Sequence, residues 1–288
     1  MLNFQILFDD SEISAFDDEA YSRYGKLGFP EAPADRPWIY ANFVQTLDGI
    51  VSLLGVHASG ADIAQSEEDR WLMDLLRAHA DAVLMGMGTL MLERHLERPR
   101  LRGPVFRVVD PELQQLRRKL GRGTERNIFI TSTGNLQLSD FAAFDGDRVQ
   151  AAIVTTTAGA ARLKPQRNTH PHVELIVTNK DGEVDLPAAM KILRREFGMR
   201  YLLCEGGPVL YGHMLRAGLI DEKFLTVAPL DAGQQIPAEQ ESVPWKQPAM
   251  RPTIFSGTGF TREHLMRWRW LSCRKAGDLQ FNRYRKIG

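Results

Sequence analysis

Two turns that contain glycine are the part of this sequence best suited to hold a ligand. Each follows a short apolar run and precedes a helical pattern; one is "MGMGTL", with Gly86, Gly88 and Thr89, and the other is "EGGPVL", with Gly206 and Gly207. Glycine lets a ligand approach the backbone, and the free N–H groups at a helix start favour phosphate. Together the turns predict a site for one dinucleotide, although either alone could serve only the fold. Neither has the G-x-G-x-x-G spacing of a Rossmann site.

Glu205 stands directly before the second pair of glycines. A carboxylate is an electrostatically awkward neighbour for a phosphate, so we expect it to face an amine, an imine or ring N–H donors. There it could accept hydrogen bonds or help to move a proton. The alternative is that Glu205 caps a turn or pairs with an arginine.

Alternating strands and helices must position these turns. Apolar, β-branched runs predict strands, and apolar periodicity predicts helices at 66–80, 185–198 and 208–218; the strands lie near 38–49, 81–86, 126–134, 149–157, 173–179, 200–207 and 223–230. This alternation indicates an α/β fold, with a central, mostly parallel mixed sheet and helices on both faces. Residues 262–286 alternate around Gly277 and Asp278, which predicts a C-terminal antiparallel hairpin. The arginines of this hairpin suggest a solvated face.

The N-terminal 35 residues differ from the rest of the chain, because they are acidic and then rich in proline. We expect residues 1–35 to form an arm that packs on one domain spanning 36–288, or else a partly disordered leader. A polar, proline-rich stretch at 231–252 predicts a long loop.

The charge balance and the cysteines exclude several classes of protein. Basic and acidic residues both number 36, so a nucleic-acid or anionic-membrane partner is not expected. No apolar run approaches the roughly 20 residues needed to span a bilayer, and the N-terminus does not read as a signal peptide. Cys204 and Cys273 are far apart, which suits a reducing cytoplasm. His57, His79 and His95 lack metal-ligand spacing, so we expect no metal.

Three stretches carry a resemblance to a known family: "RPWIYANFVQTLDG", "LLRAHADAVLMGMGTL" and "LLCEGGPVLYGHMLRAGLIDEKFLTVAPL". The chain resembles the reductase domain of the riboflavin-biosynthesis bifunctional deaminase-reductase, which has a dihydrofolate-reductase-like fold. The resemblance covers nearly all of residues 36–286. The zinc motif of the deaminase half, H-x-E with P-C-x-x-C, is not found, so the chain looks like a stand-alone reductase.

This resemblance implies NADPH as the cofactor and a phosphoribosylaminopyrimidine as the substrate, most simply 5-amino-6-(5-phosphoribosylamino)uracil, whose sugar is reduced at C1′. It implies that Glu205 contacts the substrate, with Ser59 and Arg77 nearby. The residues assigned to the cofactor are Val44, Gly86, Gly88, Thr89, Gly206, Gly207, Pro208 and Leu210. Ser132 plausibly meets the adenosine end, or is a strand-end hydroxyl satisfied by the backbone.

The sequence departs from the family where the substrate would bind. Asn42 stands where the family often has a substrate-binding lysine, and Glu93 replaces an aspartate. The phosphate-binding arginine could be Arg98, Arg100 or Arg102, and we assign Arg100. Asp48 could orient the substrate, although its Asp-Gly pair also favours a simple turn.

Two other functions remain open on the sequence alone. The chain could reduce dihydrofolate or another heterocycle on the same fold, or it could be a non-catalytic nucleotide-binding regulator. The family also suggests a homodimer, for which apolar residues of the last hairpin could serve.

Overall fold

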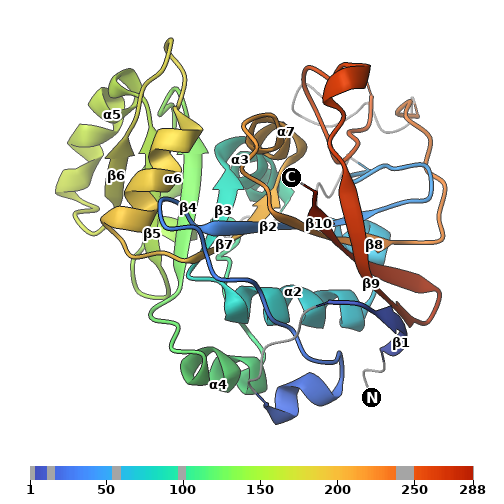
Figure 1. The fold of residues 1–288 in the computed structure, drawn as a ribbon. Helices are drawn as coiled ribbons and strands as arrows, with labels where there is room; N and C mark the ends of the chain where they lie inside the picture. The colour runs from blue at the N-terminus through green and yellow to red at the C-terminus, as the bar shows by residue number, and fades with distance from the viewer. Residues whose placement is uncertain (1–3, 12–16, 54–59, 97–101, 238–249, 288) are drawn as a thin grey trace.

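The structure is a computed structural model that describes residues 4–11, 17–53, 60–96, 102–237 and 250–287. One ten-stranded sheet runs through it in the order β1-β9-β10-β8-β2-β7-β3-β4-β5-β6 (Figure 1). The strands are β1 Gln5–Asp9, β2 Trp38–Gln45, β3 Ala82–Gly86, β4 Arg126–Thr131, β5 Gln150–Thr155, β6 Glu174–Val177, β7 Tyr201–Gly206, β8 Glu222–Val227, β9 Trp268–Ala276 and β10 Leu279–Lys286.

The sheet is mixed in the way that the sequence predicts. From β8 to β6 every neighbouring pair is parallel, whereas β8, β10, β9 and β1 pair antiparallel. Strands β9 and β10 form the predicted hairpin, which extends the sheet beyond β8. The carboxyl ends of the parallel strands therefore lie along one edge, where open α/β sheets place their ligands.

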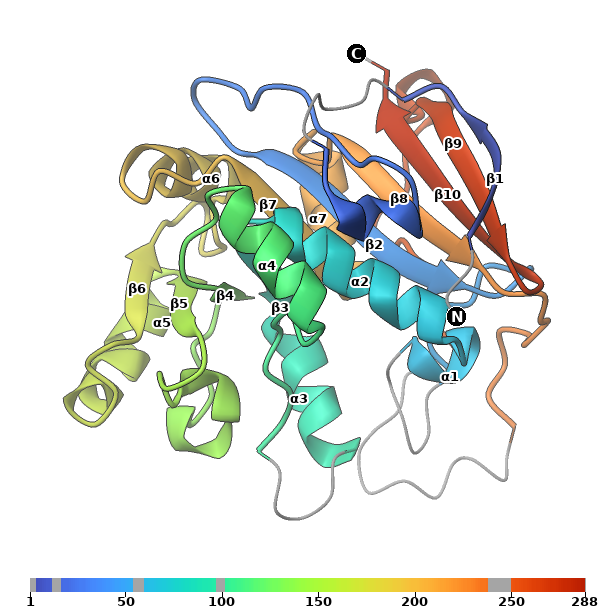
Figure 2. The same cartoon turned by 90° about the horizontal axis from the view of Figure 1, so that it is seen from below.

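Helices cover both faces of the sheet, as predicted. They are α1 Ala61–Ala64, α2 Glu67–His79, α3 Met87–Leu96, α4 Pro111–Lys119, α5 Thr157–Leu163, α6 Leu186–Arg195 and α7 Pro208–Arg216. Helices α2 and α4 pack on one face, around what we call the first core, and α6 and α7 pack on the other, around the second core. Seen from below, α2 and α4 lie in front of the sheet (Figure 2). None of the described helices is long and apolar enough to cross a bilayer.

Helix α2 matters most for the site. Ser66 caps it by accepting hydrogen bonds from the N–H groups of Glu68 and Asp69, at 3.1 and 3.3 Å. Three acidic residues in the first turn of α2 interact favourably with the positive end of the helix dipole. Its apolar stripe, Trp71, Leu72, Leu75 and Leu76, is buried in the first core. The helix is thus held by its own sequence across the face of the sheet.

The N-terminal arm packs on this domain through the hairpin. Phe4, Tyr21, Tyr24 and Leu27 belong to the first core, and β1 pairs with β9. Two hairpin arginines, Arg274 and Arg283, donate to backbone carbonyls of Tyr24 and Gly28 at 2.6 Å. Both arginines are buried, at 1% and 2% exposure. The expectation that the hairpin arginines share a solvated face is therefore wrong for these two, because the arm covers them.

Candidate active site

The predicted site residues come from neighbouring strands at one edge of the sheet. Strands β8, β2, β7, β3 and β4 are adjacent in that order. Asp48 follows β2, Glu205 and Gly206 end β7, Gly86 ends β3, and Ser132 follows β4. Their carboxyl ends meet because the strands are parallel. Residues far apart in the sequence thus lie along the same edge of the sheet.

The two glycine turns touch each other. The N–H of Gly207 donates to Oγ1 of Thr89 at 2.9 Å, which joins the start of α7 to the first turn of α3. A Cβ on Gly207 would lie 2.6 Å from the same oxygen, and a Cβ on Gly206 would lie 2.9 Å from the ring of Phe43. A Cβ on Gly86 would lie 3.4 Å from Cβ of Leu210. A larger residue at Gly207 would therefore push the two turns apart, and one at Gly206 would collide with Phe43.

The two helices that begin at these turns suit a phosphate group. Neither α3 nor α7 has an acidic residue in its first turn, whereas α2 has three. The residue before α7 is Gly207, which makes no side-chain cap, and Pro208 at the first position has no N–H to satisfy. The positive helix ends and free N–H groups remain available to an anion. The residues present therefore fit a dinucleotide phosphate.

Glu205 pairs with Arg77, as the alternative reading of the sequence allowed. Nε of Arg77 donates to Oε1 and Nη2 donates to Oε2, both at 2.7 Å. The two side chains are only 9% and 7% exposed. Leu203 lies in the first core and Cys204 in the second, so Glu205 points toward α2. The guanidinium balances the charge of the carboxylate close to the two glycine turns.

Arg77 is itself held on several sides. Its Nη1 donates to the carbonyl of Arg107 at 3.2 Å and lies 3.5 Å from a carboxylate oxygen of Asp74. Its guanidinium also lies 5.8 Å from the ring of Phe106. Although burial opposes the charge, the carboxylates of Glu205 and Asp74 raise the pKa of Arg77. The arginine is thus fixed as a cation that orients Glu205, rather than extended toward a substrate phosphate.

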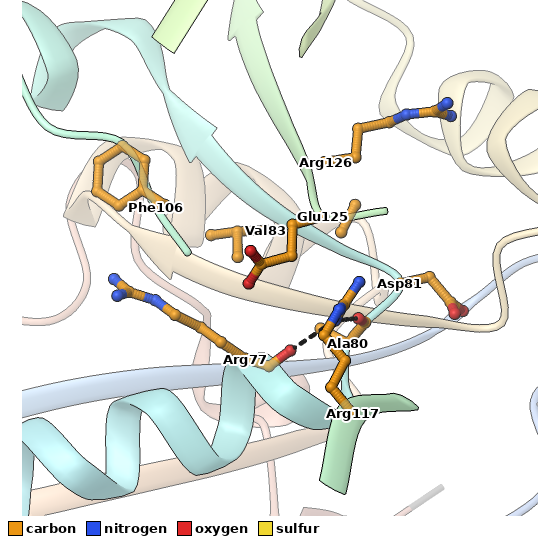
Figure 3. Close-up of a pocket in the computed structure, with 9 residues that line it drawn as sticks. Arg77, Ala80, Asp81, Val83, Phe106, Arg117, Glu125 and Arg126 are labelled. Carbon is orange, nitrogen blue, oxygen red and sulfur yellow. Dashed lines mark hydrogen bonds between the residues drawn. The ribbon is translucent and has the colours of Figure 1, made fainter. Parts of the chain in front are cut away.

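A small cavity lies behind Arg77, away from the carboxyl ends. It has a volume of about 10 Å³, room for about one water molecule, and Arg117 and Glu125 line it with Arg77 and Phe106 (Figure 3). Arg117 donates to the carbonyls of Arg77 and Ala80, at 3.0 and 2.5 Å, so it closes the C-terminal end of α2. We interpret this cavity as part of the packing that supports α2 and not as a ligand site.

Asn42 and Val44 face α2 from β2. Their neighbours Ala41 and Phe43 lie in the second core, whereas Tyr40 lies in the first, so alternate residues point toward α2. The Oδ1 atom of Asn42 is buried and has no hydrogen-bond partner among the described residues. Val44 packs against the first core, and a Cβ on Gly60 would meet its Cγ1 at 2.3 Å. Ala41 is the last residue of β2 paired with β7, opposite Cys204, so Asn42 lies beside Glu205.

Asp48 ties two loops together. Its carboxylate accepts the N–H groups of Ala232 and Gly233, at 3.2 and 2.6 Å, and the hydroxyl of Thr46. These hydrogen bonds, led by that from Thr46, lower the pKa of Asp48. Gly49 follows with a φ of +85°, as an Asp-Gly turn requires. The contacts match the turn interpretation of Asp48.

The remaining predicted residues are placed less directly. The carbonyl of Ser132 accepts the hydroxyl of Thr156 at 2.7 Å, beside the start of α5. Arg102 pairs with Asp145 and donates to the carbonyl of Ser139 at 2.8 Å, so it is engaged away from Glu205. Ser59, Arg98 and Arg100 lie outside the described residues.

Sequence reasoning missed two groups that face the same space. Thr226 on β8 points toward α2, because Phe224 lies in the first core and side chains alternate. Asp69, in the first turn of α2, lies close to Thr226. Acidic residues near a cap are normal in a helix start, so Asp69 carried no separate signal in the sequence.

Comparisons with known proteins identify a family to which most of the chain is similar. Residues 37–277 match the family model described as the RibD C-terminal domain. A 2,5-diamino-6-ribosylamino-4(3H)-pyrimidinone 5′-phosphate reductase from Archaeoglobus fulgidus is 28% identical over 202 residues, which are 69% of this chain and 83% of that protein. The reductase of the same name from Methanothermobacter thermautotrophicus is 25% identical over 198 residues, 69% of this chain and 80% of that protein.

A solved structure shares the fold. The crystal structure of a pyrimidine reductase-like protein from Corynebacterium diphtheriae superposes with a TM-score of 0.65 at 23% identity, and the match covers 93% of this chain and 98% of that one. The predicted fold is confirmed.

Proposed function

The chain belongs to the RibD C-terminal domain family and is a reductase, and we propose that it reduces the sugar of a 6-(5-phosphoribosylamino)pyrimidine with NADPH. The named relatives act on the 2,5-diaminopyrimidinone form of this substrate. The uracil form that the sequence suggested differs at C2 of the ring, which carries an oxo group in place of the amino group. Reduction at C1′ of the sugar is common to both forms.

The observation that carries this proposal is the contact between the two glycine turns beside the Arg77–Glu205 pair. Thr89 and Gly207 hold the turns together, and a Cβ at Gly206 or Gly207 would collide with its neighbours. Glycine at these two positions therefore allows the turn after β7 to pack closely against Phe43 and Thr89. A buried ion pair next to such a cradle places a charged carboxylate where a substrate would meet the cofactor.

The residues of α3 and α7 would hold the cofactor. Free N–H groups at Val209 and Leu210 suit a phosphate, and the strand ends at Gly86 and Gly206 allow close approach. When bound, NADPH supplies the hydride for the reduction. Ser132, just after the neighbouring strand β4, would lie toward the adenosine end. We propose NADPH rather than NADH from the resemblance to the family.

Glu205 would position the substrate and support proton movement. Arg77 holds the carboxylate in one orientation through two hydrogen bonds, and each oxygen keeps a lone pair for a substrate donor. The substrate amine or imine N–H is a suitable donor for this carboxylate.

The test is the consumption of NADPH by the purified protein with each phosphoribosylaminopyrimidine, followed by absorbance, with NADH as a control. We expect turnover with NADPH and a fall of about 100-fold in kcat for Glu205→Gln. Identification of the ribityl phosphate product by mass spectrometry fixes the site of reduction.

Two outcomes would contradict the proposal. Turnover with dihydrofolate alone would keep the cofactor and change the substrate. Binding of NADPH without turnover of any heterocycle would favour the non-catalytic alternative, and Glu205→Gln would then leave NADPH binding unchanged.

We also propose that the protein is a cytoplasmic homodimer. Trp270 in β9 and Leu7 in β1 are 48% and 52% exposed, which offers apolar surface at the hairpin edge. Both cysteines are free and buried, as suits a reducing compartment. Light scattering after gel filtration measures the mass; a single 32.5 kDa species would contradict the dimer.

A further inference from the structure

A polar cluster between β2, β8 and the first turn of α2 has no role in the reduction itself. It consists of Asn42, Asp69 and Thr226, and we call it the acceptor cluster. We propose that the acceptor cluster binds the edge of the substrate ring that carries the 2-amino group, and that it selects a 2-aminopyrimidinone over a pyrimidinedione. This inference rests on the proposed function and adds the ring specificity of the same site.

The three residues share one face of the sheet. Asn42 lies opposite Phe224 and Val44 lies opposite Thr226 in the pairing of β2 with β8. Asn42 and Thr226 are therefore diagonal neighbours, about 7–8 Å apart between their backbones. This spacing matches the width of a six-membered ring with its substituents. Glu205 lies beyond Asn42 on β7, so a ring held here would direct its sugar-bearing side toward Glu205 and the glycine turns.

One atom of the cluster is buried without a partner. Oδ1 of Asn42 makes no hydrogen bond with the part of the chain that is described. Thr226 is 1% exposed, and its hydroxyl lies beside the carboxyl group of Asp69. A buried polar atom without a partner costs about 1–3 kcal/mol, and a ligand that offers an N–H group to Asn42 would satisfy it.

Asp69 completes the cluster from the helix. Burial raises its pKa, and the nearby Thr226 hydroxyl and Arg70 oppose part of that rise. Its side chain carries none of the described salt bridges, unlike Glu205, Asp74 and Asp81. Glu67 is exposed, and the carboxylate of Glu68 accepts the hydroxyl of Ser66 at 2.9 Å. Asp69 lies beside Thr226 on β8, so it is the acid of this turn that faces the sheet.

The chemistry of the cluster favours one ring over the other. A 2-amino-4(3H)-pyrimidinone presents two adjacent donors, the ring N–H and the amino group, which match the two oxygens of a carboxylate. The second amino hydrogen can reach Oδ1 of Asn42. A pyrimidinedione places a carbonyl oxygen at C2, which would face the carboxylate of Asp69 and the oxygen of Asn42. The carboxylate of Asp69 and Oδ1 of Asn42 would then both face another hydrogen-bond acceptor, so the pyrimidinedione would bind more weakly.

The experiment compares kcat/KM for the 2-amino and the 2-oxo forms of the phosphoribosylaminopyrimidine with the full chain. We expect the wild type to favour the 2-amino form at least about tenfold. Asp69→Asn should lower kcat/KM for the 2-amino form about 100-fold and change that for the 2-oxo form less than about threefold. Glu67→Gln, an exposed acid in the same helical turn, is the matched control and should change neither.

Thr226→Val provides a second variant that nearly conserves volume, with its melting temperature as the check on folding. It should reduce the preference for the 2-amino form about fivefold. An equal loss with both forms in Asp69→Asn, or a wild type that favours the 2-oxo form, would overturn the inference while the proposed function stands. A wild type that reduces neither form would overturn the proposed function, and the inference with it.

Discussion

Arg77 is the residue whose role changes most between the sequence and the structure. Its fork of hydrogen bonds to Glu205 makes it a positioning residue. A lysine keeps the charge but lacks the two parallel N–H groups, so it cannot fix the carboxylate in the same way. We expect Arg77→Lys to lower kcat at least about tenfold, with KM for NADPH changed less than about twofold. Steady-state kinetics on the purified variant measure both.

A role of Arg77 in phosphate binding would give a different result. The substitution would then raise KM, and only for the phosphorylated substrate, because a dephosphorylated analogue makes no phosphate contact with Arg77. Measurement of kcat and KM for both substrates, in the wild type and in Arg77→Lys, separates orientation of Glu205 from phosphate binding. A selective rise in KM would show that Arg77 binds the substrate phosphate.

His79 makes the stability of the protein depend on pH. It is buried at the end of α2, with a hydrogen bond of 3.0 Å between its Nε2 and the hydroxyl of Tyr21. Burial, together with the charges of Arg122 and Arg283, lowers its pKa from 6.5 to about 3. Below pH 6.5 the unfolded chain therefore binds a proton at His79 that the folded chain does not bind. Stability should fall as the pH falls from 6.5 toward 3, at about 1.4 kcal/mol per pH unit.

The free energy of unfolding, measured with urea between pH 6.5 and 5, checks this dependence. In this range most carboxylates do not yet titrate. His79→Gln keeps a hydrogen-bonding group but has no proton to bind in this range, so its slope should be smaller by about that amount. Equal slopes in the two proteins would show that His79 is protonated in the folded state.

At the scale of elements, the hairpin depends on the arm through buried arginines. Arg274 donates to Asp9 at 2.5 Å and to Ser272 at 2.8 Å, besides the carbonyl of Tyr24. Removal of this cation leaves a carboxylate and a carbonyl without their donor. We expect Arg274→Met to lower the free energy of unfolding by about 3 kcal/mol. Arg269→Met, an exposed position on the same strand, should change it by less than about 0.5 kcal/mol.

Denaturant unfolding of both variants tests this difference. Similar midpoints for Arg274→Met and Arg269→Met would mean that the arginine is solvated, as the alternation of the hairpin alone suggested.

Local signals predicted most of the strands and the helices α2, α6 and α7, but they missed β1, α4 and α5. Long-range contacts decided what local signals could not predict. Ser66 and Asp185 are capping residues, and the predicted helices begin just after them. The glycines at 86 and 206 marked the strand ends correctly. The partner of Glu205 is 128 residues away, and that of Arg274 on the arm is 250 residues away, so no local pattern could identify either. The acceptor cluster likewise depends on the register between β2 and β8, which only the folded sheet shows.

For the whole molecule, the arm matters because it lies outside the family match, which covers residues 37–277. We propose that residues 1–35 are an integral part of the fold rather than a separate leader. Phe4 packs on Tyr24, Trp71 and Phe281, with ring centroids 5.0–5.9 Å apart, so the arm joins α2 to β10. Without it, this apolar surface and two buried arginines would meet water.

A chain that starts at Arg36 tests this proposal. We expect it to unfold at a much lower urea concentration than the full chain or to aggregate, because it loses several buried aromatic side chains, each contributing about 1.5–3 kcal/mol. Circular dichroism at rising urea measures the midpoint, and NADPH consumption at low urea shows whether the site survives. The matched control is a chain that lacks only residues 1–3, which should behave as the full chain. A midpoint unchanged by removal of all 35 residues would mean that the arm rests on a domain already complete from Arg36.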